Sequence, residues 1–74
     1  SVAGYSKEAY DNWHKKMREM LNKLTLDKIK PVVREHKLKV TGSKGDLINS
    51  LIGFYNLHPE TLPPEYPVPP AGPK

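Results

Sequence analysis

The prolines of this chain are gathered at one end, and this limits where regular structure can form. Seven of the eight prolines lie within residues 59–74. Because proline lacks the backbone N–H that helices and sheets use, the Pro-rich tail over 56–74 is predicted to be extended, polyproline-like, mobile and largely disordered. The alternative is that Tyr66 or Val68 folds back onto the preceding residues. The folded part is therefore expected to lie before residue 56.

That folded part is large enough for one small domain, since the whole chain has 74 residues. Cysteine is absent, so neither disulfides nor thiolate metal ligands can reinforce it, and an apolar core must hold the fold alone. The apolar stretches are too short for a membrane span, and the first residues do not resemble a signal peptide. We expect a monomeric domain cut from a larger protein, because the chain begins at Ser1 rather than at methionine.

A first amphipathic helix is predicted over 6–23, where apolar residues recur at spacings of three and four. Ser6 is placed to cap its start, and Asp11 is expected to pair with Lys15 one turn later. Residues 1–5 are expected to be disordered. An apolar stripe in so small a domain is more often its own core than a partner's docking site. The residues of this stripe are Tyr10, Trp13, Met17, Met20, Leu21 and Leu24.

Two further helices are predicted within 24–55, joined by an extended linker. Thr25 is positioned to cap the first of them, which should end near His36 or Lys37. Pro31 falls inside this helix, where it either bends the helix or marks the start of its regular part. The side chains expected to face inward are Ile29, Val32 and Val33.

The linker is predicted from alternation: Leu38 and Val40 should turn inward, and Lys39 and Thr41 outward. Gly42 then permits a sharp change of direction. Ser43 and Asp46 have the spacing of a capping box, which predicts the start of the last helix. Its expected inward residues are Leu47, Ile48, Leu51, Ile52 and Tyr55.

The net charge of +4 is distributed unevenly along the chain. Residues 1–23 carry +2, residues 24–52 carry +3, and residues 53–74 carry −1. A basic balance favours nucleic acid, anionic membrane or acidic protein partners. The positive charge is therefore expected to act through the helical part of the chain.

The turn before the last helix combines lysines with a helix start, whose unpaired N–H groups suit a phosphate. Asp46 counts against this site, because it places a negative charge in the same turn. The alternative is that these lysines form an ordinary solvated face. The candidate phosphate-binding residues are Arg34, Lys37, Lys39, Thr41, Gly42, Ser43, Lys44 and Gly45.

Residues 24–52 resemble the SAP motif, a DNA-binding module found in many chromatin, DNA-repair and RNA-processing proteins. The resemblance implies an all-α domain, built as helix, extended linker and helix, that binds double-stranded DNA in the nucleus. Residues 6–23, expected to form an accessory helix, and the Pro-rich tail fall outside the resemblance. The chain departs from the family at Lys37, which replaces a usual glycine, at Pro31, and at Ser50, which replaces a common arginine. The matching positions are Leu24, Thr25, Ile29, Val33, Leu38, Gly42, Lys44, Leu47 and Leu51.

The expected binding mode rests on the phosphate backbone with weak sequence preference, because the turn offers no Asn or Gln to read bases. Such a module would tether a larger nuclear protein to DNA or chromatin. RNA remains an alternative, since phosphate contacts do not exclude it. An enzyme is not expected, because His14, His36 and His58 are scattered and no catalytic group, metal site or cofactor site is apparent.

Protein interaction is the competing class of function. The basic face could dock on an acidic partner. The tail also contains LPPEY, which matches the PPxY ligand pattern of WW domains through Pro63, Pro64 and Tyr66. Short motifs of this kind often occur by chance in proline-rich linkers.

Overall fold

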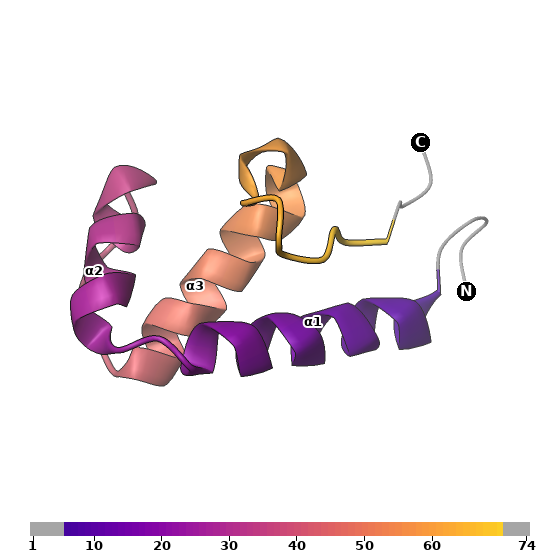
Figure 1. The fold of residues 1–74 in the computed structure, drawn as a ribbon, viewed down its shortest axis with the longest axis horizontal. Helices are drawn as coiled ribbons and strands as arrows, with labels where there is room; N and C mark the ends of the chain where they lie inside the picture. The colour runs from indigo at the N-terminus through magenta and orange to yellow at the C-terminus, as the bar shows by residue number, and fades with distance from the viewer. Residues whose placement is uncertain (1–5, 71–74) are drawn as a thin grey trace.

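The computed structural model describes residues 6–70, and this part of the chain is all-helical (Figure 1). It contains no strand, which confirms the all-α prediction, and no helix in it is long and apolar enough to cross a bilayer. Helix α3 is central, since α1, α2 and η1 all contact it. The elements are α1 (Lys7–Asn22), α2 (Leu26–Glu35), α3 (Lys44–Leu57) and the short 3₁₀ helix η1 (Pro59–Thr61). The expected disorder of residues 1–5 lies outside the described residues.

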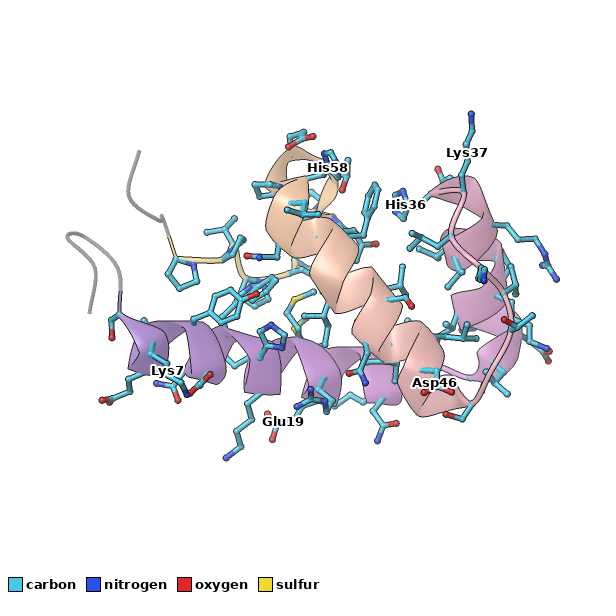
Figure 2. The ribbon with its side chains drawn as sticks, turned by 180° about the vertical axis from the view of Figure 1, so that it is seen from behind. Lys7, Glu19, His36, Lys37, Asp46 and His58 are labelled. Carbon is cyan, nitrogen blue, oxygen red and sulfur yellow. The ribbon has the colours of Figure 1, made fainter. Side chains whose placement is uncertain are left out.

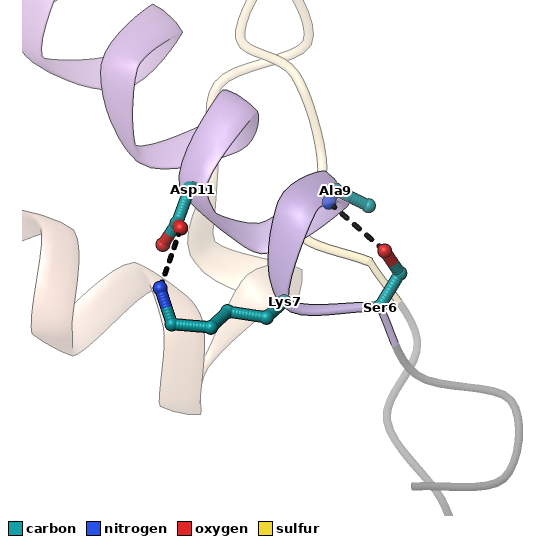
Figure 3. Close-up of polar contacts among 4 residues, drawn as sticks. All are labelled: Ser6, Lys7, Ala9 and Asp11. Atoms are coloured by element: carbon teal, nitrogen blue, oxygen red, sulfur yellow. Dashed lines mark hydrogen bonds and ion pairs between the residues drawn. The ribbon is translucent and has the colours of Figure 1, made fainter. Parts of the chain in front are cut away.

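Helix α1 begins as the sequence predicts, with Ser6 as its cap (Figure 3). The Ser6 hydroxyl accepts a hydrogen bond from the Ala9 N–H at 3.3 Å. Asp11, however, accepts from the Lys7 ammonium at 2.8 Å, so the predicted pairing with Lys15 is corrected. Either lysine lies one turn from this carboxylate, and an ion pair this exposed contributes little to stability. The hydrogen bond and charge of Asp11 raise the pKa of Lys7.

The core is one cluster of ten apolar side chains drawn from all three α-helices, each at most 4% exposed. Half of these side chains belong to α3, and they are the five inward residues predicted for that helix. Tyr10, Leu24 and Val32 pack partly buried around the cluster. The helix expected to be accessory therefore belongs to the same core as the other two. The core residues are Trp13, Met17, Leu21, Ile29, Val33, Leu47, Ile48, Leu51, Ile52 and Tyr55.

Helix α2 runs without a break through Pro31. The missing N–H of this proline would have bonded the carbonyl of Asp27, which is exposed and can be solvated instead. Thr25 stands at the cap position, but its side chain makes no capping bond. Its backbone carbonyl accepts from the Lys28 and Ile29 N–H groups at 3.0 Å. The regular helix therefore begins before Pro31, and the predicted Thr25 side-chain cap is absent.

The end of α2 is closed by a Schellman motif around Lys37. The Lys37 N–H donates to the Arg34 carbonyl at 2.9 Å, and the Leu38 N–H donates to the Val33 carbonyl at 3.0 Å. This geometry holds Lys37 at φ 60°, in the left-handed region, where a residue with a Cβ has a higher conformational energy. Glycine at residue 37 would relieve this backbone strain.

The first part of the tail folds back over α1 as a strap, defined here as residues 58–70 (Figure 1). Helix α3 continues to Leu57, so the tail starts two residues later than predicted. Leu62 and Tyr66 pack against the core, and the Trp13 indole N–H donates to the Pro67 carbonyl at 2.8 Å. The alternative of a tail that folds back therefore applies to Tyr66, because a proline-rich segment keeps carbonyls and apolar side chains that can pack on the helices.

Of the two residues considered for folding back, Tyr66 does so and Val68 remains 71% exposed. The tail beyond residue 70 lies outside the described part of the chain. The strap is therefore a third layer against α1 and α3.

Replacing Lys37 by glycine is expected to stabilise the domain by roughly 0.5–1 kcal/mol, because the left-handed strain is removed. Urea denaturation followed by Trp13 fluorescence measures this change. Lys37→Ala is the matched control: it removes the same charge but keeps a Cβ, so no gain is expected. Equal stabilities of the two variants would contradict the strain argument.

Replacing Tyr66 by alanine is expected to cost about 2 kcal/mol, because its half-buried ring covers the core. Val68→Ala, at an exposed neighbouring position, should change stability by less than about 0.5 kcal/mol. The same urea titration compares the two variants. If the tail did not pack on the helices, both substitutions would be neutral.

Candidate nucleic-acid interface

The linker between α2 and α3 carries exposed cations along the edge of the molecule. Leu38 and Val40 are half-buried while Lys39 and Thr41 are exposed, which confirms the predicted alternation. Figure 2 places Lys37 at one end of this linker and Asp46 at the other. The predicted site residues are therefore spread along the linker rather than gathered at the start of α3.

We define the linker strip as the four exposed candidate residues that precede Gly42 in the chain. These are Arg34, Lys37, Lys39 and Thr41. None of their side chains makes an ion pair or hydrogen bond within residues 6–70. In that part of the chain Lys7 is the one lysine paired with a carboxylate, that of Asp11. The strip therefore presents its positive charge unneutralised to solvent.

The start of α3 is closed by its own capping box, as the sequence predicts. The Ser43 N–H donates to the Asp46 carboxylate at 2.9 Å, and the Asp46 N–H donates to the Ser43 hydroxyl at 3.2 Å. A carboxylate thus occupies the positive helix end that was predicted to attract phosphate. The N–H groups of Lys44 and Gly45 have no acceptor within residues 6–70. The anion site at this helix start is correspondingly weaker than predicted.

The two glycines of the turn differ in what the fold requires of them. Gly42 has φ 101°, and a Cβ on it would lie 2.7 Å from an Asp46 carboxylate oxygen. Glycine is therefore needed there to form the capping box. A Cβ on Gly45 would meet the Ser43 hydroxyl at an ordinary 3.7 Å. Packing alone does not require glycine at residue 45.

Lys44 has a structural partner that the sequence analysis did not foresee. Its ammonium donates to the backbone carbonyl of Asn22 at 2.8 Å, and its side chain is half-buried. Asn22 is the last residue of α1, where carbonyls lack helical partners and the helix dipole favours a cation. Lys44 therefore ties α1 to α3. Nothing in the local sequence signals a contact between residues 22 positions apart.

The histidines serve aromatic packing. His14 lies against Tyr10, with ring centroids 4.6 Å apart, and His36 stacks on Phe54 at 4.3 Å. His58 lies 3.5 Å from the Glu60 carboxylate. No group of three metal-ligating side chains occurs among residues 6–70.

A cavity of about 260 Å³ lies between the strap, α2 and α3, and sequence reasoning missed it. Pro63 and Tyr66 of the WW-ligand pattern line it, whereas Pro64 is exposed. Burial raises the pKa of the Tyr55 phenol, and the nearby Tyr66 and Glu35 add to this shift. Burial also raises the pKa of Tyr66. The residues forming this cavity are too far apart in the sequence to make a local pattern.

Lysine-to-alanine substitutions should show that Lys44 contributes to stability and that the exposed Lys39 does not. Lys44→Ala is expected to lose about 1 kcal/mol of stability, because it leaves the Asn22 carbonyl and the end of α1 without a cation. Lys39→Ala should change stability by less than about 0.5 kcal/mol. Chemical denaturation compares the two variants, and equal losses would refute the role assigned to Lys44.

Comparisons of the chain with protein-family models, with curated proteins and with solved structures returned no match. The functional assignment therefore rests on the residues and their arrangement.

Proposed function

We propose that this chain is a DNA-binding module that contacts the phosphate backbone of duplex DNA and tethers a larger nuclear protein to DNA or chromatin. The observation that carries this proposal is the linker strip, whose three cations are exposed and free of carboxylate partners in the described residues. Free surface cations gain most from phosphate, because they lose no ion pair on binding.

The arrangement of residues 24–52 supports the same proposal. Two helices joined by an extended linker agree with the architecture that the SAP resemblance implies. The positions of that resemblance also have clear structural roles: Ile29 and Val33 are core residues, and Gly42 makes the turn. The pattern behind the resemblance therefore coincides with what this fold needs.

The proposed interface is centred on the linker strip, whereas the predicted one was centred on the turn at the start of α3. It lies on Arg34, Lys37 and Lys39, with Thr41 as a neutral donor. Ser43, Gly42 and the half-buried Lys44 hold the start of α3 instead. The N–H groups of Lys44 and Gly45 remain as donors at the end of the strip.

We expect weak sequence preference, because the strip has no Asn or Gln to read adenine and Arg34 is its one arginine for guanine. RNA phosphates would be held by the same charges. Binding of an acidic protein is the alternative use of this face.

WW-domain binding remains a second proposal for the tail, with a condition attached. A WW groove needs the prolines and the tyrosine of LPPEY on an accessible extended segment. Because Tyr66 packs against the core and Pro63 lines the cavity, the strap would have to lift before this motif binds.

Titration of duplex DNA at several salt concentrations tests the main proposal. We expect a dissociation constant of roughly 1–100 µM and a log–log salt slope of about −3, from three phosphate contacts. Lys39→Ala and Lys37→Ala should each reduce the slope by about 1. Binding that is absent, or independent of salt, would reject the proposal.

Lys15→Ala is the matched control for these variants, since it removes one exposed lysine from α1, outside the strip. Its slope should stay close to that of the parent chain. If Lys15→Ala weakened binding as much as Lys39→Ala, the interface would lie elsewhere. Parallel titrations with single-stranded DNA and with RNA identify the preferred nucleic acid.

A further inference from the structure

The cavity beneath the strap combines apolar walls with aromatic rings. Leu24 and Val32 form part of its apolar side, and Tyr55 and Tyr66 contribute two rings. Its volume of about 260 Å³ is close to the lower limit of small-molecule sites and sufficient for one long side chain. An aliphatic stem with a compact head group fits this shape and lining.

The charged groups on the lining and cover of this cavity are acidic, although the chain as a whole is basic. Glu35 lines the cavity, and Glu60 and Glu65 lie on the strap that covers it. Within residues 53–70 there is no lysine or arginine. Neither Glu35 nor Glu65 forms an ion pair in the described part of the chain. The acidic Glu35 is therefore the one Asp, Glu, Lys or Arg side chain among the residues that line the cavity, in a protein of net charge +4.

The carboxylates lie close to the rings of the cavity. The charge of Glu35 contributes to the raised pKa of Tyr55, and that of Glu65 to the raised pKa of Tyr66. The His36 ring lies 3.4 Å from the Tyr55 hydroxyl and completes the polar edge. Carboxylates beside the negative faces of aromatic rings favour a cation over a neutral or anionic head group.

We propose that this cavity binds a lysine side chain from a basic segment of a partner protein. The lysine methylenes would lie along Leu24 and Val32, and the ammonium would lie beside Glu35 and the tyrosine rings. One ammonium cannot neutralise both Glu35 and Glu65, so Glu65 attracts a further basic residue of the same segment. The linker strip plays no part in this site, which is independent of DNA binding.

NMR titration of the full chain with a short synthetic peptide tests the proposal. The probe is acetyl-Ala-Lys-Ser-Lys-Ala-amide, and its control is the same peptide with both lysines N-acetylated. We expect the charged peptide to shift the methyl signals of Leu24 and Val32 and the ring signals of Tyr66, with a dissociation constant of roughly 1 mM. Acetylation keeps the stem and removes the charge, so it should weaken binding at least about tenfold.

Two substitutions locate the charge that matters. Glu35→Gln keeps the shape of the side chain and should weaken peptide binding about fivefold. Glu19→Gln is the matched control, because Glu19 is an exposed carboxylate on α1, away from the cavity (Figure 2). It should leave peptide binding unchanged, and both variants should retain the dispersed spectrum of the folded chain.

Three results would overturn the proposal. The first is equal binding of the acetylated peptide, which would make the cavity merely apolar. The second is an unchanged affinity in Glu35→Gln, and the third is the absence of shifts at the cavity residues up to about 10 mM peptide. None of these results depends on whether the linker strip binds DNA.

Discussion

Burial of α3 is the constraint on which the rest of the structure depends. This helix supplies half of the core side chains, and α1, α2 and η1 are each positioned by contact with it. A chain of this size has no disulfide to compensate for a poorly placed helix. The devices that start α3, namely Gly42 and the Ser43–Asp46 capping box, therefore determine the geometry of the whole domain.

The same devices explain why the functional surface lies beside α3 rather than at its start. A capping carboxylate stabilises the helix, but it occupies the place where an external anion would bind. Lys44 is likewise held by the end of α1. Among the candidate residues, the cations left without a polar partner in the described part of the chain are Lys37, Lys39 and Arg34. Lys37 is also held in a strained backbone geometry, although glycine would fit better there.

The sequence alone predicted the helices, the inward side chains and the capping box, because each depends on residues within a few positions of one another. The core residues Leu47, Leu51 and Tyr55 follow from helical spacing alone. The bonds from Lys44 to Asn22 and from Trp13 to Pro67 join residues 22 and 54 positions apart, and no local pattern specifies them. The composition of the tail predicted its lack of regular structure, but the packing of Tyr66 depends on a surface that forms only after the helices meet.

The strap belongs both to the WW-ligand motif and to the lysine-binding cavity. Its packing supplies Tyr66 to the core and Pro63 to one wall of the cavity, so the cavity exists only while the strap is docked. A WW domain that captured LPPEY would remove that wall and disrupt the lysine site, whereas a bound lysine segment would stabilise the docked strap. The two tail ligands must therefore compete, although their binding groups only partly overlap. Duplex DNA on the linker strip would leave the strap in place, because the strip uses α2 and the linker and none of the residues of the strap.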